Sequence, residues 1–103
     1  MRRVVVTGMG AISALGHDWE SISARLKRVE NAIERMDEWD EYEGLFTRLA
    51  GPIHDFEKPA HYGRKQVRTM GRIALMSTRA TELALEDAGL LGDDILGSGD
   101  TGI

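Results

Sequence analysis

The sequence predicts an α/β fold, and two stretches of the 103-residue chain carry that prediction. Residues 3–7 read Arg-Val-Val-Val-Thr, and a continuous β-branched run is typical of an interior strand that is covered on both faces. Residues 64–88 carry small and apolar side chains at helical spacing, which predicts a helical region able to approach a sheet closely. A buried strand next to a closely packed helix is the building unit of the α/β class.

A glycine-rich turn follows the predicted strand, with Gly8, Gly10 and Gly16. Glycine lets another backbone or a ligand approach without a clash, so we expect tight packing here. One interpretation is the dinucleotide fingerprint G-x-G-x-x-G, which holds a pyrophosphate at a helix N-terminus. However, Ser13 occupies the third glycine position, and residues 27–43 are charged where the fingerprint requires a second strand. A small nucleotide-binding module is therefore the less favoured alternative.

Composition narrows the function classes. Apolar residues make up 42% of the chain and charged residues 29%, with a formal net charge of −4, which argues against a general nucleic-acid binder. The absence of cysteine excludes disulfides and thiolate metal sites. No stretch is long and apolar enough to span a bilayer, and the apolar run after Met1 is too short for a secretory signal. We expect a single-domain protein of the cytoplasm with no membrane partner.

The first helix is predicted to follow Asp18, whose side chain suits the N-cap position. Apolar residues then recur on one face at three- and four-residue spacings, namely Trp19, Ile22, Leu26 and Val29. Periodicity alone would let this helix continue to Met36.

The middle of the chain predicts an exposed excursion and a short strand. Residues 34–44 are mostly charged, and we expect Trp39 and Tyr42 to anchor them to the rest of the protein. Residues 45–53 predict a second strand, in which Pro52 suits an edge position or a strand end because it lacks a backbone donor.

The longest helical pattern, over residues 64–88, is expected to break at Gly71 and so to divide into a short and a long helix. Gly89 is placed to end the long helix in the left-handed conformation, with Leu90 making the usual accompanying contact. Glu82 and Glu86 share a face of this helix, and we expect both to be simply solvated.

Residues 4–16, V-V-V-T-G-M-G-A-I-S-A-L-G, resemble the amino-terminal signature of the β-ketoacyl-acyl carrier protein synthases. That signature is a hydrophobic strand, V-T-G-x-G, a short apolar stretch, S-P-x-G and a helix; here Ala14 replaces the usual proline. The resemblance continues through residues 31–33, 49–51, 64–70 and 84–90, and thus covers the whole chain. It also places the end of the first helix near Arg28.

The resemblance implies the thiolase-like α/β/α/β/α layered fold, with residues 1–103 as an incomplete amino-terminal portion. Residues 95–103 resemble the family's approach to the next core strand, so we expect a longer protein. That protein would be a 3-oxoacyl-[acyl carrier protein] synthase, an acyltransferase of fatty acid or polyketide synthesis. It would act as a homodimer without a dissociable cofactor.

No catalytic, cofactor-binding or metal-binding residue is expected in this chain. The family works through a cysteine and two histidines, or a histidine and an asparagine, and this chain has no cysteine. Its three histidines precede the family's catalytic positions and are expected to be surface or turn residues, namely His17, His54 and His61. The chain alone should be inactive.

What the resemblance does assign is a docking surface. In the family, the segment matching residues 64–70 meets acidic helix II of the acyl carrier protein. Lys65 and Arg68 are the leading candidates for docking, followed by Arg64 and Arg72. Thr69 stands where some members carry lysine, which weakens the expected patch. Without the resemblance, a solvated helix face would be the preferred interpretation.

A non-catalytic partner of a synthase, of the chain-length-factor kind, remains an alternative function. Such a partner lacks the nucleophile and works by pairing with an active synthase. A cysteine at the nucleophile position in sequence following Ile103 would favour the enzyme.

Overall fold

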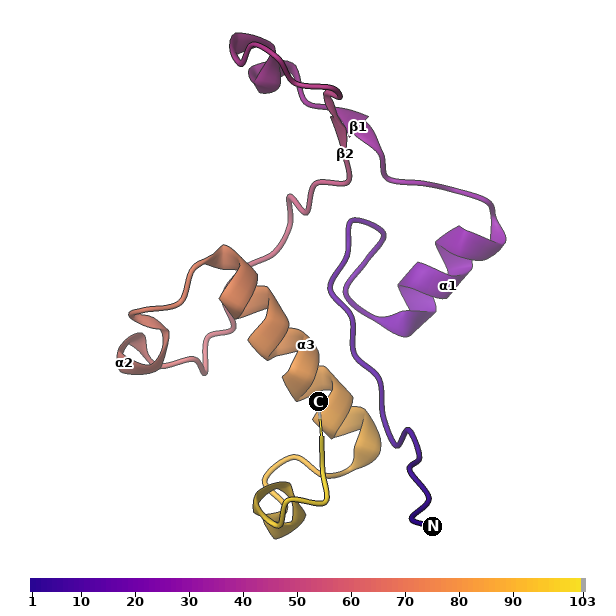
Figure 1. Ribbon diagram of the computed structural model, residues 1–103, viewed down its shortest axis with the longest axis vertical. Coiled ribbons are helices and arrows are strands. Elements are labelled where there is room, and N and C mark those ends of the chain that lie inside the picture. Colours follow the sequence, from indigo (N-terminus) through magenta and orange to yellow (C-terminus); the bar gives the residue numbers. More distant parts are fainter. Residues whose placement is uncertain (103) are drawn as a thin grey trace. The chain divides into compact units, whose positions relative to one another are not determined.

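The structure, a computed structural model, describes residues 1–102, and its contacts divide the chain into two compact units. One unit consists of Met1–Ile12 and Glu57–Ile103, and the other of Ser13–Phe56. Figure 1 shows the elements of both in sequence colours. Each unit is described by itself.

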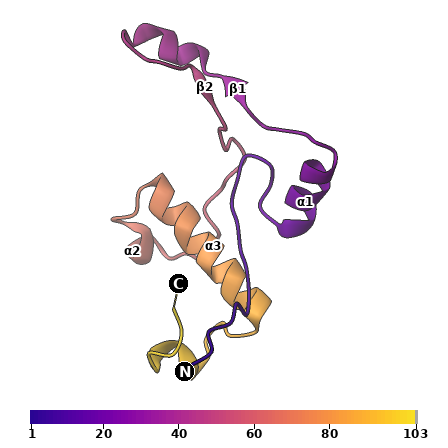
Figure 2. The ribbon, with the colours of Figure 1, turned by 45° about the vertical axis from the view of Figure 1, so that its right-hand side comes forward.

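The first unit is built around helix α3 (Arg72–Ala88), which is preceded by the short helix α2 (Arg64–Val67) and followed by the 3₁₀ helix η2 (Asp94–Gly97) (Figure 2). Gly71 is extended and forms the N-cap of α3, so the predicted break is confirmed.

The predicted helix end is also confirmed. Gly89 has φ 70°, in the left-handed region. The N–H groups of Gly89 and Leu90 then donate to the carbonyls of Glu86 and Leu85, at 3.0 and 2.9 Å. A residue without Cβ takes this conformation at little cost, which allows the last carbonyls of the helix to be satisfied.

The valine run departs from its prediction. Residues 3–7 form no strand within the part of the chain that the structure describes, and Val4, Val5 and Val6 are 94%, 66% and 82% exposed. The prediction of an interior strand at residues 3–7 is therefore wrong for the part of the chain that the structure describes. A strand is defined by its neighbours in a sheet, and the described residues place no partner strand beside this run.

The tight packing expected at the glycines is confirmed, and its partner is α3. A Cβ added at Gly8 would lie 2.3 Å from the carbonyl oxygen of Ala84, and one at Gly10 would lie 2.2 Å from that of Ala80. Glycine is thus required because two backbones approach each other, and the small side chains of α3 permit that approach. The glycines face a helix of the chain itself, so the dinucleotide fingerprint is not formed.

The second unit begins with helix α1 (Trp19–Lys27), which Asp18 caps as predicted. The Asp18 carboxylate accepts from the Ser21 amide at 2.8 Å. Arg28 ends the helix at the expected position. Ile22, at 7% exposure, is the one buried hydrophobic residue in the described part of the chain.

A two-stranded antiparallel sheet follows, formed by β1 (Glu34–Arg35) and β2 (Leu49–Ala50), with the 3₁₀ helix η1 (Asp37–Glu41) between them. Glu34 pairs with Ala50, and Arg35 pairs with Leu49. The strand predicted over residues 45–53 is confirmed only at β2. β1 was not predicted, because its two residues are charged and give no strand signal.

The charged excursion therefore contains a strand and a 3₁₀ helix. Trp39 is half-buried, as expected of an anchor, whereas Tyr42 is 55% exposed. Among the described residues, no helix combines the length and apolar character that crossing a bilayer requires.

Candidate functional site

The candidate docking surface consists of Arg64, Lys65, Arg68 and Arg72, and α2 positions most of it. The Gly63 carbonyl accepts from the amides of Gln66 and Val67 at 2.9 and 3.2 Å. The Gln66 side chain reaches back to accept from the Gly63 amide at 2.9 Å. These bonds satisfy donors at the start of the helix and close a single turn.

All four cations of this surface are exposed. Arg64, Lys65 and Arg68 form no ion pair with any residue of the described chain. Their charge is therefore not neutralised from within and is available to an external acidic group. Arg64 and Lys65 lie in α2, Arg68 is its C-cap, and Arg72 is the first residue of α3.

Arg79, the next cation along the sequence, is used differently. Its Nη1 donates to Glu82 Oε2 at 2.6 Å and lies 3.9 Å from Glu86 Oε1. The side chains of Arg79 and Glu82 are only 26% and 15% exposed. Arg79 therefore belongs to an internal ion pair of α3 and not to the docking surface.

Glu82 is the centre of a polar cluster, and the expectation that it is merely solvated is wrong. Besides Arg79, its carboxylate accepts from Tyr62 Oη at 2.8 Å and pairs with His61 Nε2. The rings of His61 and Tyr62 also meet edge to face, with centroids 4.8 Å apart. Glu86, with a side chain 47% exposed, is closer to the expected solvated state.

The cluster changes the acidity of its members. Burial alone would raise the pKa of Glu82, but hydrogen bonds from Arg79, Tyr62 and His61 outweigh it and lower that pKa from 4.5 to about 2. Burial and the hydrogen bond to Glu82 raise the pKa of Tyr62 to about 12. Both shifts favour an ionised carboxylate beside a neutral phenol, which is a stable acceptor and donor pair. The cluster is therefore a fixed structural contact at neutral pH.

The three histidines lie in loops, as predicted. His54 Nε2 lies 3.1 Å from Glu34 Oε2. His17 Nε2 lies 3.2 Å from Asp55 Oδ1, without hydrogen-bond geometry. The described residues bring together no group of side chains able to hold a metal ion.

The fold class can now be stated. A crystal structure of a β-ketoacyl synthase from Burkholderia phymatum STM815 matches 96% of this chain with a TM-score of 0.86 and 50% sequence identity. The match covers 24% of that protein. It confirms that the chain has the thiolase-like α/β fold, of which it represents the first part.

Residues 1–103 match the sequence model of the family described as "Beta-ketoacyl synthase, N-terminal domain". The chain belongs to this family. It is 37% identical over 95 residues to 3-oxoacyl-[acyl-carrier-protein] synthase 1 of Haemophilus influenzae, covering 92% of this chain and 23% of the relative. It is 35% identical over 89 residues to synthase 2 of Vibrio harveyi, covering 86% and 21%. The chain thus spans about a quarter of the length of these relatives.

Proposed function

We propose that the chain is the amino-terminal portion of a 3-oxoacyl-[acyl carrier protein] synthase. The observation that carries the proposal is the family match over all 103 residues, joined by relatives that bear this enzyme name. In the proposed reaction, an enzyme cysteine holds the acyl group as a thioester. A malonyl thioester on the carrier protein loses CO₂, its carbon forms a bond to the acyl carbonyl, and the cysteine thiolate leaves.

In this proposal the 103-residue chain is scaffold and docking surface. It contains no cysteine, so the nucleophile comes from other sequence of the same protein and the chain alone is inactive. The supporting contacts are structural: two glycines packed on α3 and a carboxylate that ties the loop before α2 to α3.

A condensation assay tests the enzyme assignment. The full-length protein, given malonyl and acyl thioesters of an acyl carrier protein, should release CO₂ and form a 3-oxoacyl product, while the 103-residue chain should do neither. A full-length protein that lacks the cysteine, shows no turnover and raises the activity of an active synthase would instead be a non-catalytic partner.

We further propose that the full-length protein is a cytoplasmic homodimer that binds an acyl carrier protein through the docking surface. The support is the exposure of Arg64, Lys65, Arg68 and Arg72, and the finding that the first three form no ion pair within the described residues. Light scattering should give twice the mass of one full-length chain, and a mass equal to one chain would contradict the dimer.

Charge reversal tests the docking surface. In the full-length protein, Lys65→Glu with Arg68→Glu should weaken carrier-protein binding by about tenfold or more at low salt, and the loss should shrink as salt rises. Each single reversal, Lys65→Glu or Arg68→Glu, has Lys27→Glu as its charge-matched control, because Lys27 is also exposed but lies on α1 in the other unit. Equal binding by the double variant and the wild type at low salt would remove the docking role.

A further inference from the structure

Glu82 connects the segment before α2 to the middle of α3. Its two contacts from that segment come from consecutive residues: His61 pairs with one carboxylate oxygen and Tyr62 donates to the other. Gly63, the N-cap of α2, follows directly, and Arg64 and Lys65 are the first two residues of the helix. The Glu82 carboxylate therefore binds the chain two and three residues before Arg64, the first cation of the docking surface.

Helix α2 has little ability to hold its own place. It contains four residues, and a single helical turn does not persist without outside contacts. Its described residues include no buried side chain. The orientation of α2 therefore depends on the segments that flank it.

The loop before α2 is held by hydrogen bonds to the backbone of Tyr62, the residue whose side chain contacts Glu82. The Tyr62 amide donates to the Pro59 carbonyl at 3.1 Å, which closes a turn. Lys58 Nζ donates to the Tyr62 carbonyl at 2.9 Å and to the Pro59 carbonyl at 3.4 Å. Because backbone and side chain of Tyr62 are both held, a contact at its hydroxyl also fixes the start of α2.

We propose that Glu82 is a positioning residue for the docking surface, acting through Tyr62 and His61 on α2. The inference rests on the proposed function, since the surface is the one that receives the acyl carrier protein. Glu82 does not touch the partner. It sets where Arg64, Lys65 and Arg68 present their charges.

The sign of the effect separates positioning from simple electrostatics. Glu82 is an anion near a surface that binds an acidic partner, so its charge alone opposes binding. Neutralising it should strengthen binding if only charge matters. If Glu82 positions α2, the same change should weaken binding, because glutamine keeps only one acceptor oxygen and cannot hold His61 and Tyr62 with two separate oxygens.

The experiment compares Glu82→Gln and Tyr62→Phe with the control Glu86→Gln in the full-length protein. The control makes the same charge change one helical turn away, at a carboxylate whose side chain is 47% exposed and 3.9 Å from Arg79. With the Haemophilus influenzae acyl carrier protein as probe, Glu82→Gln and Tyr62→Phe should each bind about fivefold more weakly. Glu86→Gln should bind as well as the wild type or better. Equal affinity of Glu82→Gln and Glu86→Gln would overturn the proposal.

Kinetics distinguish positioning from general loss of structure. For Glu82→Gln, KM for malonyl carrier protein should rise while kcat and the KM for malonyl coenzyme A stay near wild-type values, because a small thioester bypasses docking. A fall in kcat with both substrates would mean that Glu82 serves overall stability only, and would contradict the proposal.

Amide hydrogen exchange measures how stably α2 and the loop before it are held when no partner is present. Glu82→Gln should speed exchange over residues 61–68, and Glu86→Gln should not. A wild-type protein that binds no carrier protein would refute the docking function, while faster exchange in Glu82→Gln alone would still support the positioning of α2. Unchanged exchange over residues 61–68 would refute the positioning.

Discussion

In the unit formed by Met1–Ile12 and Glu57–Ile103, residues far apart in the sequence meet through close backbone contacts and one half-buried carboxylate. In the unit formed by Ser13–Phe56, the carboxylates that pair with arginines are more exposed than that carboxylate. Two carboxylates make the difference concrete. Glu82 has a side chain 15% exposed, and that of Glu30 is 41% exposed.

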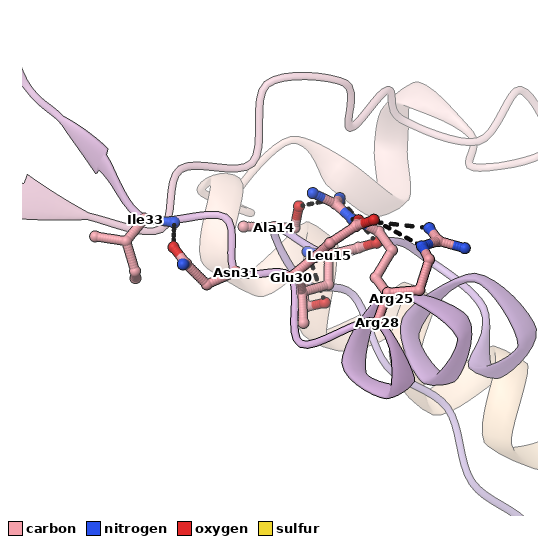
Figure 3. Close-up of polar contacts among 8 residues, drawn as sticks. Ala14, Leu15, Arg25, Arg28, Glu30, Asn31 and Ile33 are labelled. Carbon is pink, nitrogen blue, oxygen red and sulfur yellow. Dashed lines mark hydrogen bonds and ion pairs between the residues drawn. The ribbon is translucent and has the colours of Figure 1, made fainter.

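Glu30 pairs with two arginines, whereas Glu82 pairs with one. Glu30 accepts from Arg25 Nε at 3.1 Å and from Arg28 Nε at 2.6 Å. Figure 3 shows that Arg25 also reaches the carbonyls of Ala14 and Leu15, at 3.3 and 3.2 Å. These bonds join the turn before α1 to its last turn, but solvent screens the charges. The number of ion pairs is therefore a poor guide to which contact matters, and burial is a better one.

The largest effect is expected where backbones touch. Gly10→Val should lower the free energy of unfolding of the full-length protein by about 3 kcal/mol, because a side chain cannot fit against the Ala80 carbonyl without displacing α3. Gly97→Ala is the control, since nothing lies within 4 Å of its added Cβ. Urea unfolding measures both, and similar midpoints would show that residues 8–10 do not pack on α3.

The next effect concerns the two carboxylates. Glu82→Ala should lower the free energy of unfolding by about 2 kcal/mol, because Tyr62, His61 and Arg79 lose their shared acceptor. Glu30→Ala should lower stability less, and its effect should fade in about 1 M salt. Thermal unfolding of both variants at low and high salt measures these losses of stability. Equal losses in Glu82→Ala and Glu30→Ala at both salt concentrations would contradict the role assigned to burial.

The contribution of Glu82 should depend on pH in a defined direction. Its pKa is lowered from 4.5 to about 2 in the folded protein, so the folded state stays ionised where the unfolded state takes up a proton. The stabilisation is present above pH 4.5 and is lost as pH falls towards 2. The difference in unfolding free energy between wild type and Glu82→Gln should shrink over that range. A constant difference would mean that ionisation is not involved.

The smallest effect is expected in the two-stranded sheet. Asp40 accepts from Arg35 Nη2 at 2.6 Å and lies 2.6 Å from Arg48 Nε, which links a residue of β1 to the residue before β2. Asp40→Asn should leave the unfolding midpoint near that of the wild type, because the side chains of Arg35 and Asp40 are 54% and 51% exposed and asparagine keeps an acceptor oxygen. The local change should appear as faster exchange of the Met36 amide, which donates to the Arg48 carbonyl at 2.7 Å. Glu38→Gln is the control, and equal exchange in both variants would contradict the local role.

Much of the local structure was predictable from sequence. The Asp18 cap, the break at Gly71 and the left-handed end at Gly89 were each predicted and are confirmed. Such boundaries depend on residues only a few positions apart, whose hydrogen bonds and φ preferences act within one helical turn. The exposure of the four cations of the candidate docking surface was predictable for a different reason, because lysine and arginine are rarely buried without a partner.

The Glu82 cluster was not predictable in this way. His61 and Tyr62 lie 21 and 20 residues before Glu82, and no periodicity or motif links residues at that separation. A pair of acids on one helical face gave only the expectation of solvation. The pairing of β1 with β2 was hidden in a similar way, because a Glu-Arg strand carries no hydrophobic pattern.

By itself, the sequence determined where α1 begins, where α2 and α3 divide and where α3 ends, together with the family motif and the need for close packing at Gly8 and Gly10. Tertiary structure decided which partner meets those glycines, which carboxylate is shielded from solvent, and that the valine run stays exposed within the described residues. The physical reason is the range of the interactions. Caps and turns act between near neighbours in the chain, whereas burial and sheet pairing need surfaces that distant residues supply.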